Sequence, residues 1–225
     1  MENINKPYKC IIFISMLYFV CFIGSAILAN RLILIDGITG SAATLIFPIT
    51  YLCSDTIAEV YGYKVAKQII WSGLLCEIIF SLIMFFLIQL PAPKNWVLKN
   101  DYYIVLDPLL RICIASFVAM GLGAFINIYL LTKWKISFKG KMFWLRSFIA
   151  STIGELIFTV IADFIIFYGK ISHGNLLSII ITSYLFKLIF APLAVMAASI
   201  LVIILKNIEQ IDVYDYNTNF NPFKA

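Results

Sequence analysis

Charged residues are scarce in this sequence of 225 residues. They make up only 13% of the chain, whereas 62% is hydrophobic and the mean hydropathy is +0.97. A soluble domain usually carries about 25% charged residues. The deficit excludes an ordinary soluble domain and indicates a chain divided into membrane spans, each of which needs about 20 mostly apolar residues.

Catalytic and metal-binding patterns are also missing. The single histidine, His173, falls in a predicted loop, and the five cysteines show no CxxC spacing. Cysteines inside apolar segments usually act as small hydrophobes. No Ser–His–Asp arrangement, phosphate-binding glycine loop or zinc spacing is present. We therefore expect neither an enzyme nor a cofactor or metal site.

Six apolar stretches predict an all-α integral membrane protein, with a single six-helix domain over residues 1–225. The second stretch is short and interrupted by Pro48, the fourth begins with Asp107 as N-cap before Pro108, and Pro192 is expected to kink the sixth. Residues 206–225 are expected to form a polar cytoplasmic tail. The predicted spans are about 11–29, 39–54, 68–90, 107–132, 147–168 and a segment within 174–205.

The positions of the basic residues predict the orientation of these spans. With both termini in the cytoplasm, the inner segments hold 11 of the 17 basic residues, the outer segments five, and Lys187 lies within the membrane. Cytoplasmic loops carry an excess of Lys and Arg, so the imbalance favours this orientation. The net charge of +5 is then an orientation signal and an attraction to anionic lipid, not a sign of nucleic-acid binding. No cleavable signal peptide is expected.

Two acids end the second apolar stretch, in the run FPITYLCSDTIAEVYG. Asp55 and Glu59 are four residues apart, so a helix places them on one face, with Tyr51 and Tyr61 nearby. Acids at a helix end are often simply solvated, and acids beside apolar sequence can instead form a binding site. The spacing alone leaves both interpretations open.

Further polar residues lie within the predicted spans, where an ionisable group costs about 2.5–3.5 kcal/mol. Glu155 follows small residues that allow close approach of a helix or ligand. It is therefore a stronger candidate for a functional residue than Asp163. We expect Arg111 and Lys187 to be neutralised by Glu77, Glu155 or Asp163. Asn127 is a candidate to bond a ligand or a neighbouring helix.

The chain resembles the queuosine precursor transporter family, also called the vitamin uptake transporter family. The resemblance lies in ANRLILI, FPITYLCSDTIAEVYGYKVAKQIIW, RICIASFVAMGLGAFINIYLL, RSFIASTIGELIF and SYLFKLIFAPL. Many members place an Asp a few residues after the ST-G unit, where this chain has Phe158 and Thr159. The resemblance implies a substrate-binding site that draws on Asp55, Glu59, Tyr51, Tyr61, Arg111, Asn127, Glu155 and Lys187.

The implied substrates are 7-deazaguanines such as 7-cyano-7-deazaguanine, salvaged to make the modified tRNA base queuosine. A deazaguanine presents an N–H and an amino group along one edge. The two oxygens of a buried carboxylate can accept a bidentate pair of hydrogen bonds from these two groups. Aromatic rings such as Phe47 and Trp71 are candidates to sandwich the base. We expect import across the bacterial inner membrane by this chain, alone or as a homo-oligomer. Two alternatives are a vitamin-binding subunit that needs a separate energising complex, and a membrane anchor or assembly protein that transports nothing.

Overall fold

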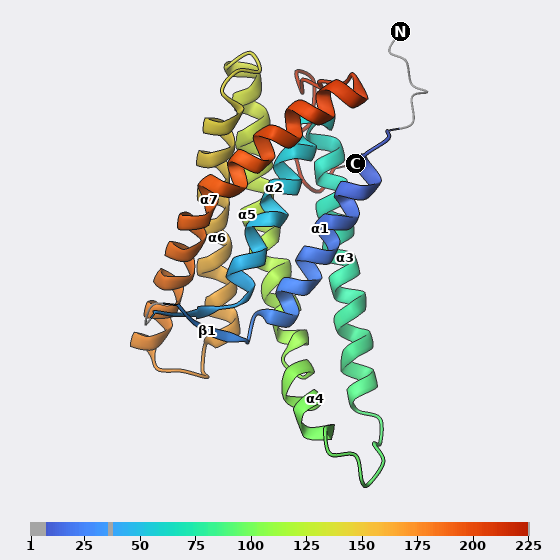
Figure 1. The fold of residues 1–225 in the computed structure, drawn as a ribbon, viewed down its shortest axis with the longest axis vertical. Helices are drawn as coiled ribbons and strands as arrows, with labels where there is room; N and C mark the ends of the chain where they lie inside the picture. Colours follow the sequence, from blue (N-terminus) through green and yellow to red (C-terminus); the bar gives the residue numbers. More distant parts are fainter. Residues whose placement is uncertain (1–7, 36–37, 225) are drawn as a thin grey trace.

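A computed structural model describes residues 8–35 and 38–224 and is almost entirely helical (Figure 1). Long apolar stretches form its helices, since only helices satisfy every backbone group within one segment. The elements in chain order are α1 (Ile11–Leu28), β1 (Leu32–Ile35), β2 (Ile38–Ser41), α2 (Ala43–Tyr61), α3 (Tyr63–Ile88), α4 (Lys99–Leu106), α5 (Leu109–Ser137), α6 (Phe143–Phe167) and α7 (His173–Glu209).

The long helices run alternately up and down between two ends of the bundle (Figure 1). At one end, which we call the tail end, α1 begins and α7 finishes, and the carboxylate of Glu209 accepts hydrogen bonds from the backbone N–H groups of Lys9 and Cys10. The other end, the hairpin end, carries the antiparallel pair β1–β2, with Leu32 opposite Ser41. Among the described residues, five segments are long and apolar enough to cross a membrane. The protein is therefore an all-helical membrane protein.

Helix α2 is the interior helix of the bundle. It buries 14 of its 19 residues and packs against α1, α3, α5, α6 and α7, while the outer helices expose many large apolar side chains. The expected span over 39–54 is corrected in two respects. The helix continues through Pro48 and ends only at Tyr61, so Asp55 and Glu59 lie inside it and are each 1% exposed. The interpretation of these acids as solvated helix-end residues is wrong.

Other boundaries also differ from expectation. Helix α5 continues to Ser137 and α6 begins at Phe143, so Lys135 and Arg146 are buried helix residues and not loop charges. Asp107 ends the short helix α4 and makes no side-chain cap for α5, which has Pro108 at its N-cap. Helix α4 and the hairpin were not predicted.

Two glycines allow α5 and α6 to pack very closely. A Cβ atom on Gly154 would lie 2.7 Å from the carbonyl oxygen of Gly123, 2.9 Å from Cβ of Asn127 and 3.0 Å from the ring of Tyr51. Small residues are typical of such close helix contacts in membranes. The contact brings Asn127, Tyr51 and the middle of α6 together.

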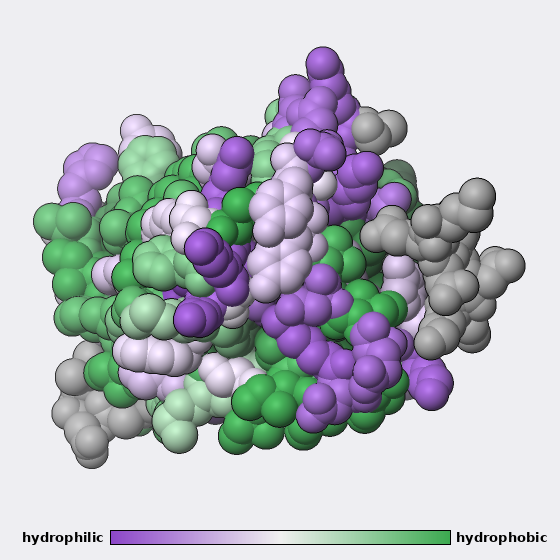
Figure 2. Space-filling model, turned by 90° about the horizontal axis from the view of Figure 1, so that it is seen from above, coloured by the Kyte–Doolittle hydropathy of each residue, from purple (hydrophilic) through white to green (hydrophobic). Residues whose placement is uncertain are grey.

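The C-terminal tail, residues 210–224, folds back over the tail end. The backbone N–H of Val213 donates to the carbonyl of Val60, the N–H of Tyr63 donates to Asp215, and the indole of Trp71 donates to the carbonyl of Pro222. Figure 2 views the molecule from this end, where hydrophilic side chains gather with hydrophobic ones around them. The predicted polar tail is thus a packed cover over α2, α3 and α5.

Candidate functional site

Polar side chains form a column through the bundle because two helices repeat them every fourth residue. Along α6 the repeat is Ser147, Ser151, Glu155, Thr159 and Asp163, and along α2 Asp55 and Glu59 continue a line that starts with the aromatic rings of Phe47 and Tyr51. Residues four apart lie on one helix face. Helices α2, α6 and α7 therefore face one another across a polar column with aromatic walls.

Both carboxylate oxygens of Asp55 accept hydrogen bonds from neutral side chains. One carboxylate oxygen accepts from the amide of Asn127 at 2.5 Å, and the other accepts from the hydroxyls of Ser147 at 2.5 Å and Ser151 at 2.8 Å. Three donors satisfy a buried carboxylate that has no basic partner. The cluster ties α2 to α5 and α6 and leaves Asp55 little freedom to bind anything else in this conformation.

Glu155 lies one turn further along α6 and is 2% exposed. Its carboxylate makes no hydrogen bond or ion pair within the described part of the chain, and the buried hydroxyl of Tyr51 and carbonyl oxygen of Asn127 have no partner there either. Glu155, Tyr51 and Asp55 line a small cavity against Ala191–Ala198 of α7, the tail-side cavity. Its volume is about 10 Å³, enough for a single water.

Lys187 of α7 lines a second cavity. Its ammonium donates to the hydroxyl of Thr159 at 2.9 Å and lies over the rings of Phe47 and Phe158, 4.5 and 4.9 Å from their centroids. The expected ion pair with an acid is not formed, although Asp163 and Glu155 are the nearest acids that act on its charge. Two aromatic faces and a hydroxyl take the place of a direct partner.

The second cavity, the hairpin-side cavity, has a volume of about 50 Å³. Its lining combines the rings of Phe47 and Phe158 with Lys187, Asp163 and Ser116. Glu155 and Asp163 thus face different cavities, as their angular separation of roughly 80° on an ideal helix allows.

Glu59 lies at the centre of an ion network at the tail end, formed with Lys135, Arg146, Lys206 and Asp212. The guanidinium of Arg146 binds its two oxygens at 3.0 and 3.2 Å, and Lys206 binds one of them at 3.0 Å. Lys135 donates to the carbonyl of Glu59 and to Asp212, each at 2.5 Å. The network joins α2, α5, α6, α7 and the tail, which closes the column at this end.

Asp212 is the one member of the ion network that lies in the tail. Partial burial raises the pKa of Asp212, but hydrogen bonds from Lys135 and Lys206 outweigh this and hold the pKa below its ordinary value. The contribution of Asp212 to stability is therefore complete at neutral pH and is lost only as the pH falls through that lowered pKa. Because Asp212 is 40% exposed, the contribution is small.

Besides Glu59, three residues singled out in the sequence lie away from the cavities. Tyr61 donates its hydroxyl to Glu209 at 2.9 Å, and Trp71 packs against the tail. Arg111 was expected to pair with an acid, but it does not. Its guanidinium donates to the carbonyls of Ile165 and Tyr168, which are the unpaired acceptors that a helix C-terminus offers. The structure thus brings Asp55, Tyr51, Asn127 and Glu155 together, places Lys187 next to them, and separates Glu59, Tyr61 and Arg111.

Sequence reasoning missed several residues that complete these clusters. Ser147 binds Asp55, Arg146 binds Glu59 and Thr159 binds Lys187. The four-residue repeat of polar side chains on α6 is a signal that could have identified Ser147 and Thr159. The charge of Arg146 was assigned to a loop because the helix start was placed one turn too late.

The groups available in the column suit the recognition of a ligand. Buried acceptors at Glu155 and the Asn127 carbonyl, the hydroxyl of Tyr51, a cation at Lys187 and stacked rings suit a flat, polar, aromatic molecule. Among the described residues there is no group of His, Cys, Asp and Glu side chains that could hold a metal ion.

Comparison with known proteins identifies the family of this chain. The profile of a family described as "Putative vitamin uptake transporter" matches residues 41–202, which include α2, α6 and most of α7. A curated relative, the queuosine precursor transporter of Escherichia coli (strain K12), is 20% identical over 190 residues, which cover 83% of each chain. No solved structure matches.

Proposed function

Because the chain belongs to the vitamin uptake transporter family, we propose that it imports a 7-deazaguanine precursor of queuosine across the bacterial inner membrane. Membership makes it a transporter and not an enzyme. The name of the Escherichia coli relative supports the substrate class. The observation that carries the proposal is the cluster of Glu155, Tyr51 and Asn127 buried inside a membrane bundle, where the Tyr51 hydroxyl and the Asn127 carbonyl oxygen have no partner among the described residues.

Substrate recognition is centred on Glu155. Its carboxylate is the acceptor for the N–H and amino group of the deazaguanine edge, because both oxygens of Asp55 are already occupied. Asp55 instead holds Asn127 and the two α6 serines in position. Tyr51 and Asn127 offer further polar contacts. Phe47 and Phe158, whose centroids lie 4.2 Å apart, form the aromatic wall next to Lys187.

This conformation is a closed state of the transport cycle. The two cavities, of about 50 and 10 Å³, are far smaller than the roughly 300 Å³ or more of typical ligand pockets. Admission of a base therefore requires α7 to separate from α2 and α6. Pro192 lies within α7, next to the tail-side cavity, and removes one helix hydrogen bond at the place where this bending is needed.

We place both termini in the cytoplasm, with six helices spanning the membrane: α1, α2, α3, α5, α6 and α7. A reporter fused after residue 225, or inserted between α5 and α6, is then expected to report cytoplasm. A reporter inserted near Asn95, between α3 and α4, is expected to report periplasm. The measurement is the activity of a paired cytoplasmic and periplasmic reporter. A periplasmic signal from either of the first two sites overturns the orientation.

Complementation tests the proposed function. The chain is expressed in a bacterium that can neither make queuosine precursors nor import them, and the cells are fed 7-cyano-7-deazaguanine, 7-aminomethyl-7-deazaguanine or queuine. We expect queuosine in tRNA to reappear with at least one of them. No queuosine with any precursor, from a chain that reaches the membrane, contradicts the proposal. Uptake by the purified chain alone in liposomes excludes both the subunit that needs an energising complex and the membrane anchor.

A further inference from the structure

Glu77 is a buried acid that the proposed substrate site does not use. It lies in the middle of α3 and is 1% exposed. Neither of its carboxylate oxygens has a hydrogen-bond partner within the described part of the chain, and it forms no ion pair there. An ionised carboxylate without donors or water is strongly unfavourable at membrane depth. The geometry is that of a neutral, protonated acid.

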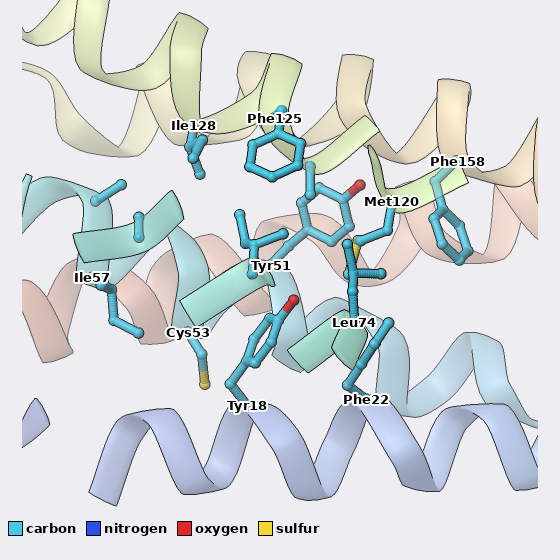
Figure 3. Packing of buried hydrophobic residues seen from close by; sticks show 14 of the residues in the cluster. Tyr18, Phe22, Tyr51, Cys53, Ile57, Leu74, Met120, Phe125, Ile128 and Phe158 are labelled. Atoms are coloured by element: carbon cyan, nitrogen blue, oxygen red, sulfur yellow. The ribbon is translucent and has the colours of Figure 1, made fainter. Parts of the chain in front are cut away.

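The surroundings of Glu77 supply no counter-charge. The titratable groups that face it are the phenol of Tyr18 from α1 and the thiol of Cys113 from α5, with the Ser116 hydroxyl beside them. Tyr18 lies against α3 because Gly73 leaves room for it; a Cβ there would lie 2.8 Å from the Tyr18 ring. Figure 3 shows Tyr18 between Cys53 and Leu74, inside the apolar core. In this conformation the Ser116 hydroxyl makes no hydrogen bond to Glu77, so ionisation of Glu77 requires these helices to move and bring that hydroxyl, water or another donor into contact.

Ser116 connects Glu77 to the transport column. It faces the Glu77 carboxyl group and also lines the hairpin-side cavity together with Asp163 and Lys187. In the proposed orientation this cavity lies toward the outside. A proton from the outer solution can therefore reach Glu77 when the hairpin end opens, through a cavity that already contains polar groups.

From this arrangement we propose that Glu77 is a proton-binding site that couples substrate import to the entry of a proton. The inference rests on the proposed function. The Glu77 carboxylate takes up a proton from outside, forming an O–H bond, and the neutral acid permits the closed state seen here. When the tail end opens, that bond breaks and the proton passes to the cytoplasm. No other bond changes, and the proton gradient supplies the energy.

Transport in liposomes tests the coupling. The purified chain is reconstituted, and uptake of radiolabelled 7-deazaguanine is measured with and without an inward proton gradient and with an uncoupler. We expect the wild-type chain to accumulate substrate several-fold above the outside concentration only with the gradient. Glu77→Gln, which mimics the neutral acid, is expected to equilibrate substrate and never to concentrate it. Gradient-driven accumulation by Glu77→Gln overturns the proposal. Transport by the wild type that does not depend on the gradient also overturns it, but leaves the proposed function intact.

Infrared spectroscopy of the same protein tests the protonation state without any transport. We expect the carboxylic acid C=O band of the wild type at neutral pH to lose intensity in Glu77→Gln, while the helical content stays unchanged. An unchanged band shows that Glu77 is ionised and overturns the proposal even if no deazaguanine is transported. The matched control is Asp101→Asn, which removes an exposed acid from α4 and is expected to alter neither the band nor the coupling.

Discussion

Glu155→Gln is expected to lower uptake of the deazaguanine by roughly 30-fold or more while the protein still folds and inserts. The change keeps the size of the side chain but replaces one acceptor oxygen by an NH2 donor. The side chain can then no longer accept hydrogen bonds from both the N–H and the amino group of the deazaguanine. Removing one partner of a buried charge-assisted pair costs about 2–5 kcal/mol, which corresponds to a factor of 30 or more. No described residue forms a hydrogen bond or ion pair with the Glu155 carboxylate, so Glu155→Gln breaks no direct contact of the fold and removes only a longer-range attraction to Lys187.

The measurement is initial uptake into cells, normalised to the amount of protein in the membrane. Asp101→Asn serves again as the control for loss of a negative charge at an exposed position. Asp55→Asn provides a contrast, since Asp55 accepts three hydrogen bonds and its change is expected to reduce both uptake and folded protein. Normal uptake by Glu155→Gln would remove Glu155 from the substrate site.

Glu59→Gln is expected to destabilise the protein strongly. The carboxylate faces Arg146, Lys135 and Lys206, and its loss leaves three cations with Asp212 as their only remaining acid in the ion network. Breaking a buried ion pair by removing one partner costs about 3–5 kcal/mol. Thermal unfolding in detergent should show a markedly lower midpoint, and less protein should elute as a single species.

A double variant tests whether the destabilisation by Glu59→Gln comes from the uncompensated positive charge or from the altered packing of the side chain. Glu59→Gln combined with Arg146→Gln removes one charge of each sign and should recover part of the lost thermal stability. A midpoint for Glu59→Gln that equals that of the wild type would show that the ion network does not stabilise the closed end. A double variant no better than Glu59→Gln alone would show that Arg146 is not its principal partner.

The class of fold was predictable because composition and long apolar stretches limit the chain to membrane helices. The interior helix was harder to define, since α2 is enclosed by other helices and does not need the apolar character of a lipid-facing span. Its polar residues therefore moved the predicted end to Ser54, about two turns before the helix ends at Tyr61. The same effect shortened α6, because Arg146 looked like a loop charge until its partner Glu59 was known.

The site could be predicted in part. The spacing of Asp55 and Glu59 placed both acids in one helix, and the small residues before Glu155 indicated a close helix approach, which the contact between Gly123 and Gly154 confirms. The sequence could not distinguish the roles of the acids, because these depend on partners from other helices. Asp55 has three neutral donors, Glu59 has cations and Glu155 has no partner among the described residues. Only packing assigns those partners.

The most direct test of the account is equilibrium binding of radiolabelled 7-cyano-7-deazaguanine to the purified, detergent-solubilised chain, with guanine and 7-aminomethyl-7-deazaguanine as competitors. The account predicts saturable binding at one site per chain, displaced by a deazaguanine and lost in Glu155→Gln but retained in Asp101→Asn. Binding of a deazaguanine that is equally strong in Glu155→Gln, or no saturable binding of any of these bases to folded protein, would contradict it.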